Sequence, residues 1–264
     1  MSRTLTLIHA GWTAARDTAR SGRGADALTQ VTRLLARPDL PAVVAADAHR
    51  LAAEILIEGE RYAAARRHLR AARELQPLHA RGFYLAGLAA ERDPDGSDRR
   101  AAVRFRTASE LEPGNALFRA AFGRAAVRCD RAATGVRELT AAAEAGLEDT
   151  AVLRVAVDGL LEAGRVGAAR TVLIKARFAR PRNADVLRLW DRVRFEAVRR
   201  GQRKTRSPQD ARVATEGAFP FLPFVRIAGG TSPRHPAKGP ATRRDLLSIP
   251  RPHFARFGAT KADR

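Results

Sequence analysis

The sequence predicts an all-α protein, built as a solenoid of about five helical hairpins with a capping helix and a mostly irregular, basic C-terminal tail. The first observation is composition. Of the 264 residues 45% are hydrophobic, yet aromatic residues make up only 6%, and much of the apolar fraction is alanine. Many small side chains and few large ones suit closely packed helices better than a β-sandwich. The second observation is a set of small, large apolar and proline residues that recurs at fixed offsets.

The clearest copy of this pattern is "YAAARRHLRAARELQP", residues 62–77. Ala65, Leu69 and Ala72 stand at offsets 0, 4 and 7, which lie on one face of a helix. Pro77 follows at offset 12 and ends the helix, because proline cannot donate to the preceding turn and restricts the residue before it. The same offsets recur, once with leucine in place of the proline, at Ala101, Phe105, Ala108 and Pro113; at Gly135, Leu139, Ala142 and Leu147; and at Ala169, Leu173, Ala176 and Pro181.

A second helix is expected before each of these. A small or β-branched residue precedes each first position by twelve residues, at Ala53, Gly123 and Val157. In one unit Gly87 precedes Ala101 by fourteen, and the extra residues fall in "RDPDGSD", which indicates an enlarged turn. Each unit is therefore a helix, a turn and a helix, with small residues that let the paired helices approach closely.

The period is about 34 residues, and it divides the chain in order. The predicted units are 8–41, 46–79, 80–115, 116–149 and 150–183, and a helix at 184–201 covers the last apolar face. The first unit is the weakest match and carries Ala15, Ala27, Val31 and Leu34 at the corresponding positions. We expect residues 1–201 to form one repeat domain.

These positions, over some 175 residues, resemble the tetratricopeptide repeat (TPR) family. The sequence departs from the family pattern in that the aromatic residue expected early in the first helix appears only as Phe83. The resemblance implies a right-handed αα-hairpin solenoid, whose first helices line a concave groove that holds peptides or partner helices. The protein would then be a non-catalytic scaffold or adaptor with a protein partner.

The groove positions that the resemblance implies are Arg50, Glu54, Phe83, Tyr84, Leu88 and Arg124. One subclass of the family holds a C-terminal carboxylate with lysine and asparagine at such positions, and this sequence has neither there. Glu54, one helical turn from Arg50, would also oppose a carboxylate. The groove is expected to combine charged positions with an apolar and aromatic middle. An acidic ligand is one open interpretation of these positions, and an ordinary solvated helix face without a ligand is the other.

Motifs for catalysis or cofactor binding are missing from the sequence. The spacing of Gly159 and Gly164 imitates a phosphate-binding loop, but Arg165 and Val166 stand where lysine and serine or threonine are needed. No histidine pair has the spacing of a zinc site, and Cys129 lies in an alanine-rich helix with no histidine nearby in sequence. We therefore expect no enzyme activity, cofactor, metal or small-molecule substrate.

The formal net charge is +20, and arginine supplies almost all of it. A GC-rich genome and a polyanion partner are both open explanations. The strongest basic run is 188–206, where Arg192, Arg199, Arg200, Arg203 and Lys204 form a candidate basic patch. The alternative function is therefore electrostatic, unspecific association with RNA or DNA.

The composition changes after Gly201. Residues 202–264 are rich in proline, glycine and arginine without a sustained period, which predicts a largely disordered tail. Within it, 218–228 is an apolar docking segment with Phe219, Phe221, Phe224 and Ile227. Its prolines favour an extended conformation, and it could be a latch on the repeats, a partner-binding motif or a permanently packed ending.

A cytoplasmic location is the expectation from the remaining features. Cys129 is the only cysteine, so a reducing compartment suits the chain. The N-terminal apolar run is interrupted by His9, Gly11 and Trp12, which argues against a signal peptide. No segment reaches the ~18 apolar residues of a membrane-spanning helix.

Overall fold

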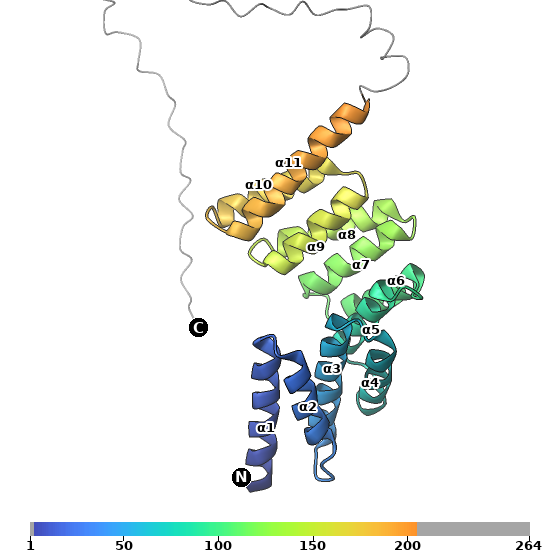
Figure 1. Ribbon diagram of the computed structural model, residues 1–264. Coiled ribbons are helices and arrows are strands. Elements are labelled where there is room, and N and C mark those ends of the chain that lie inside the picture. Colours follow the sequence, from blue (N-terminus) through green and yellow to red (C-terminus); the bar gives the residue numbers. More distant parts are fainter. Residues whose placement is uncertain (1–2, 205–264) are drawn as a thin grey trace, which may run out of the picture. The chain divides into compact units, whose positions relative to one another are not determined.

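A computed structural model describes residues 3–204, and these form eleven helices and no strand (Figure 1). The all-α prediction is confirmed. The described helices all lie in the first of two units of the chain, Met1–Glu216, and the second is Gly217–Arg264. The predicted docking segment 218–228 and the rest of the tail from 205 lie outside the described residues, and the domain boundary at 201 stays a prediction.

The helices pair into five hairpins followed by one helix. They are α1 (Arg3–Arg20) with α2 (Gly24–Leu35), α3 (Ala42–Glu58) with α4 (Tyr62–Leu75), α5 (Ala80–Arg92) with α6 (Asp98–Leu111), α7 (Ala116–Arg128) with α8 (Ala132–Ala145), α9 (Thr150–Glu162) with α10 (Val166–Ala179), and α11 (Ala184–Lys204). Each predicted unit corresponds to one hairpin, although α1 begins at Arg3, before the predicted start of the first unit.

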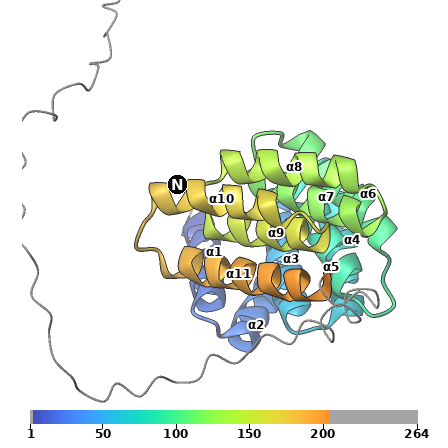
Figure 2. The ribbon, with the colours of Figure 1, turned by 90° about the horizontal axis from the view of Figure 1, so that it is seen from above.

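Successive hairpins stack on one another. Each second helix packs on the first helix of the next unit, as α4 does on α5 and α6 on α7, and several first helices also pack on each other, as α7 does on α9. At the C-terminal end α9, α10 and α11 pack together and run side by side (Figure 2). This nearest-neighbour packing is what defines a solenoid.

The predicted proline stops lie where the second helices end. The α4 helix ends at Leu75, α6 at Leu111 and α10 at Ala179, in each case two residues before the proline. The residue between them, such as Gln76 before Pro77, has left the helical conformation. The steric restriction on a residue before proline explains this common ending.

The small residues lie where paired helices approach most closely. A Cβ atom built on Gly87 of α5 would lie 2.6 Å from the Phe105 ring of α6. One built on Gly135 of α8 would lie 2.7 Å from the Gly123 carbonyl oxygen of α7. Because these separations are below ordinary van der Waals contact, only glycine fits at these positions without a shift of the helices.

The cores of the units are made of alanine with a few large side chains. Ala53, Ala65 and Ala101 are fully buried, and so are Phe105, Leu139 and Leu173 at the predicted large positions. Phe105 is packed with Ala121 and Ala125 of the next unit, so the core of one unit is completed by its successor.

The α11 helix covers the apolar face of the last hairpin. Val186, Leu189 and Val193 are buried in the same cluster as Leu160 of α9 and Val172 of α10. The Arg200 guanidinium donates to the Leu161 carbonyl oxygen at 2.7 Å, close to the end of α9. This is the capping role predicted for residues 184–201.

Candidate binding surfaces

The predicted groove residues do not gather in one place. Arg50 and Glu54 line a hollow between the first helices of the first two units. Phe83 lies in a different hollow, between second helices. Tyr84 stacks on Phe118 of α7 with ring centroids 4.9 Å apart, and Leu88 is partly buried in the core clusters on either side of α5. The role of these residues in ligand binding stays a prediction.

The first-helix hollow is bounded by α1, α3 and the first turn of α5, and its volume is about 720 Å³. Its two sides carry opposite charges. The α1 side contributes Arg16 and Arg20, and the Arg16 guanidinium lies over the Trp12 ring at 6.0 Å. The α3 side contributes the carboxylates Asp47, Glu54 and Glu58.

The buried guanidinium of Arg50 belongs to the wall of this hollow. Arg50 is only 3% exposed, and its Nη2 donates to Asp47 Oδ1 at 2.5 Å and to Gln76 Oε1 at 2.7 Å. It thereby connects α3 to the end of α4. Glu54 accepts from Arg81 of α5 at 2.5 Å, which connects the second unit to the third.

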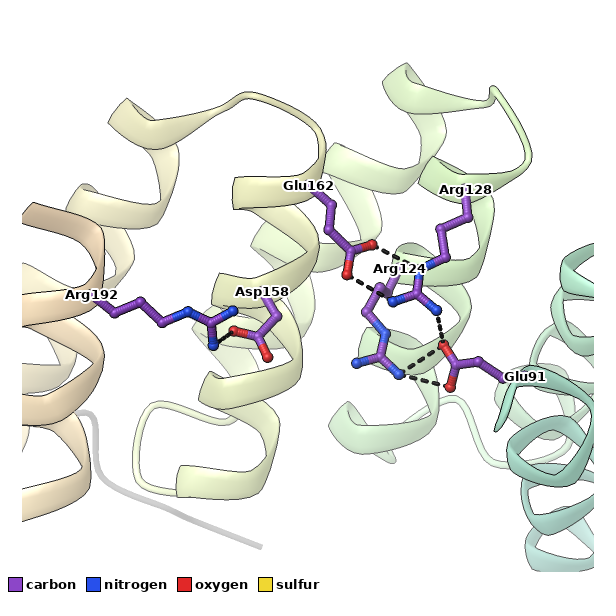
Figure 3. Close-up of polar contacts among 6 residues, drawn as sticks. All are labelled: Glu91, Arg124, Arg128, Asp158, Glu162 and Arg192. Carbon is purple, nitrogen blue, oxygen red and sulfur yellow. Dashed lines mark hydrogen bonds and ion pairs between the residues drawn. The ribbon is translucent and has the colours of Figure 1, made fainter. Parts of the chain in front are cut away.

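A chain of ion pairs continues along the first helices of the later units (Figure 3). Glu91 of α5 accepts from Arg124 of α7 at 2.7 Å and from Arg128 at 2.9 Å. Arg128 reaches further and donates to Glu162 of α9 at 2.8 Å. The Glu91 carboxylate is only 5% exposed, whereas the Arg128 and Glu162 side chains are about one-third exposed.

This arrangement raises the pKa of Arg128, chiefly through its hydrogen bonds to Glu162. The guanidinium therefore stays charged under all ordinary conditions. The predicted groove residue Arg124 is held in the same network, so its charge is already balanced by Glu91 within the protein.

The sequence contains a signal for these pairs in the spacing of opposite charges. Arg128 and Glu162 are 34 residues apart, as are Asp158 and Arg192, so each pair occupies equivalent positions of neighbouring units. Opposite charges one period apart predict ion pairs between successive first helices, because the period places those residues side by side.

The predicted basic patch is largely engaged in ion pairs of its own. Arg192 donates to Asp158 of α9 at 2.5 Å. Arg199 and Arg200 both donate to Glu196 Oε1, at 2.8 and 2.7 Å, and these hydrogen bonds lower the pKa of Glu196 to about 2. Arg203 and Lys204 are the C-terminal part of α11. For three of the five predicted residues, a carboxylate of the protein itself therefore binds the guanidinium.

A histidine pair connects α3 and α4. The Nδ1 atoms of His49 and His68 are 2.9 Å apart, so one ring donates to the other and both cannot carry a proton there. Burial lowers the pKa of His49 and of His68, and neighbouring positive charge lowers both further.

Among residues 3–204 no group of three or more His, Cys, Asp or Glu side chains is arranged to hold a metal ion. Over the same range no helix is long and apolar enough to span a membrane.

The stacked hairpins and their glycine and alanine contacts define the class of the fold, which is an αα-hairpin solenoid. Comparison with solved structures makes this specific. A thermophilic TPR protein from Thermus thermophilus aligns with a TM-score of 0.58 and 16% identity, over 72% of this chain and 99% of its own. PilF from Pseudomonas aeruginosa aligns with a TM-score of 0.55 and 18% identity, over 80% of this chain and 97% of its own.

The APC/C heterotetramer Cut9-Hcn1 also contains this fold, with a TM-score of 0.53 and 17% identity over 68% of this chain and 34% of the matched chain. These similarities show that the chain has the TPR fold, which confirms the resemblance seen in its sequence. No protein-family model matches the sequence, and no curated protein matches it.

Proposed function

We propose that this protein is a non-catalytic scaffold that binds a protein ligand through the first-helix hollow. The observation that supports the proposal is a lining that carries both charges, with Arg16 and Arg20 on α1 and Asp47, Glu54 and Glu58 on α3. Asp47 and Glu54 are bound by Arg50 and Arg81 within the protein. The TPR fold supports it, since solenoids of stacked hairpins present extended surfaces suited to binding other chains.

An extended peptide is the ligand that suits this hollow best. A peptide carries hydrogen-bond donors and acceptors along its backbone and side chains of either charge, so both sides of the hollow have something to bind. Trp12 adds a partly buried aromatic surface beneath Arg16, and aromatic and arginine side chains contribute strongly to protein interfaces.

The test is affinity capture from native cells with full-length protein and a charge-exchanged variant. Arg20→Glu with Glu58→Lys reverses one exposed charge on each side of the hollow and leaves the net charge unchanged. We expect the captured partner to be lost. The matched control, Arg170→Glu with Asp191→Lys, makes the same exchange at exposed positions of α10 and α11. Equal capture by all three proteins would refute the hollow as the site, and no captured protein at all would refute the scaffold.

The Phe-Pro segment 218–228 is proposed as a latch on the repeats or as a second contact with the partner. Its support comes from sequence alone, in the clustering of Phe219, Phe221 and Phe224 with Ile227 nearby. Replacing the three phenylalanines by serine in the full chain keeps length and charge. Weaker capture would indicate a partner-binding motif, and stronger capture a latch that competes for the hollow. Unchanged capture would exclude both roles.

Association with RNA or DNA is the second candidate, and the net charge of +20 is the observation that favours it. It predicts binding that falls steeply as salt rises, and binding that is flat in salt or missing at low salt would exclude it. The expected cytoplasmic location likewise stays a prediction.

A further inference from the structure

A second hollow lies between the second helices α4 and α6, with α5 as its floor, and its volume is about 590 Å³. The floor is apolar. It is formed by Leu69 and Ala72 of α4, by Phe83 and Ala86 of α5, and by Val103 of α6, which is 62% exposed. We call it the α4–α6 groove.

The charge of this groove is of one sign. Seven arginines line it, and no aspartate or glutamate does. Two of the seven are neutralised by neighbours, since Arg50 binds Asp47 and Arg66 binds Asp93. The other five are Arg70 and Arg73 on α4 and Arg99, Arg100 and Arg104 on α6, and within residues 3–204 no carboxylate pairs with any of them.

This distribution is the opposite of that on the first helices. There, Arg81, Arg124, Arg128 and Arg192 each lie within hydrogen-bonding distance of a carboxylate. Around the α4–α6 groove the guanidinium groups of two facing helices are left without anions over an apolar floor. Like charges on facing walls repel one another, so an anion bound between them would reduce the electrostatic repulsion between the arginines of α4 and α6.

One further atom is left without a partner at this groove. His79 lines it, and its buried Nδ1 atom has no hydrogen-bond partner among the described residues.

We propose that the α4–α6 groove binds an acidic peptide segment of a partner protein, with a large apolar side chain set between carboxylates. The carboxylates would pair with the arginines of the two walls, where bidentate geometry makes such bonds strong. The apolar side chain would cover Leu69, Phe83 and Val103. This proposal is independent of the first-helix hollow, which is lined by other residues apart from Arg50 and carries both charges.

The chemistry of the groove argues against two other occupants. The chain's own tail has 13 basic and four acidic residues from 201 to 264, a net charge of +9, so the arginines would repel it. Single-stranded nucleic acid is bound on several aromatic side chains against which successive bases stack, and the lining of this groove offers a single Phe, Tyr or Trp side chain, Phe83.

The experiment measures binding of fluorescein-labelled peptides to the full-length protein by fluorescence anisotropy. The probe is the acidic peptide DEDFDELD, and two matched peptides, DEDSDESD and KRKFKRLK, remove the apolar side chains or invert the charge. A single-stranded oligonucleotide of similar length competes for the site. Low salt of about 50 mM keeps the electrostatic contribution large.

Three variants locate the site. Arg70→Glu with Arg100→Glu reverses one exposed arginine on each wall, and we expect the dissociation constant for DEDFDELD to rise at least tenfold. Arg33→Glu with Arg170→Glu changes the net charge equally at exposed positions of α2 and α10, and we expect less than a twofold change. Val103→Ser weakens the apolar floor, and we expect a rise of about threefold. Because all these side chains are exposed, thermal melting should confirm that each variant is folded.

The outcomes separate the proposal from its alternatives. Tenfold weakening in the groove variant alone, with weak binding of DEDSDESD, supports it. Equal weakening in the α2 and α10 control means that only the net charge acts, and the proposal fails. Displacement of the peptide by a lower concentration of oligonucleotide, lost in the groove variant, would reassign the groove to nucleic acid. Capture of a partner through the first-helix hollow would be unaffected by any of these results.

Discussion

Gly87 and Gly82 lie on the same helix and are expected to respond in opposite ways to alanine. A Cβ atom at Gly87 meets the Phe105 ring at 2.6 Å, and Phe105 is fully buried, so the ring has little space to shift into. We expect Gly87→Ala to lower the free energy of unfolding by about 1–3 kcal/mol, the usual cost of overpacking. Urea denaturation measures the change.

Gly82 supplies the control, since a Cβ atom there has no neighbour within 4 Å. Gly82→Ala should raise the free energy of unfolding by about 0.5–1 kcal/mol, because alanine is the better helix former. Equal destabilisation by the two variants would contradict the close approach of α5 and α6.

The His49–His68 pair makes stability depend on pH. Burial lowers the pKa of both side chains below their ordinary value of about 6.5, so the unfolded chain binds protons at a higher pH than the folded protein does. The stability that the neutral histidine pair contributes is complete above about pH 6.5 and is lost as the pH falls below that value. We expect the free energy of unfolding to decline as the pH falls below about 6.5, toward the lowered pKa values of the folded pair.

Replacing His68 by glutamine should reduce that decline, because glutamine can still bond to His49 without titrating. His9→Gln is the comparison, at an exposed position, and should leave the pH profile as it is. A profile unchanged by His68→Gln would show that the pair does not titrate as described.

At the scale of helices, one buried carboxylate joins α5 to two arginines of α7. Glu91 is almost fully buried between Arg124 and Arg128, and the Arg124 Nε atom has no partner of its own among the described residues. Glu91→Ala would leave positive charge uncompensated, and we expect a loss of about 3 kcal/mol.

Glu110 is the matched comparison, since it pairs with Arg106 within α6 and is 58% exposed. Exposed pairs contribute about 0–1 kcal/mol, so Glu110→Ala should change the melting temperature little. Equal melting temperatures for Glu91→Ala and Glu110→Ala would show that Glu91 does not stabilise the contact between α5 and α7.

The helices themselves were predictable from sequence, whereas the binding surfaces were not. Alanine at fixed offsets and proline after the last turn mark helices through local geometry, so the five hairpins and the cap can be located from the sequence alone. The partners of Arg124 and Arg192 depend on which side chains of neighbouring units meet. The offset of 34 residues between Asp158 and Arg192 held that information, but it can be used only once the period is known.

The α4–α6 groove was harder to anticipate. The family resemblance implies a groove position on the first helices for Phe83, whereas Phe83 lines a space between second helices. The distance between α4 and α6 determines whether the five arginines form a wall or a scattered surface, and neither residue type nor spacing reports that distance.

At the scale of the whole repeat array, the helices of residues 3–204 pack within their own hairpin and on the neighbouring unit, so damage should stay local. Val193 is 2% exposed at the contact of α11 with α9 and α10. We expect Val193→Asp to speed amide hydrogen exchange in α9, α10 and α11 and to leave α1 to α4 unchanged.

Val198→Asp is the control, at a position of α11 that is 59% exposed, and it should alter exchange in neither part. Faster exchange throughout residues 3–204 in the Val193 variant would mean that the array unfolds as one cooperative block.

The burial of Phe105 against Ala121 and Ala125 also has a consequence during synthesis. A ribosome delivers the chain from its N-terminus, so the phenylalanine emerges before the helix that shields it. For that interval the growing protein presents an uncovered aromatic surface, and the same is true at each later unit in turn. A chaperone that recognises exposed apolar side chains would therefore find its target at the latest unit to emerge, and would lose it when α11 arrives to close the series.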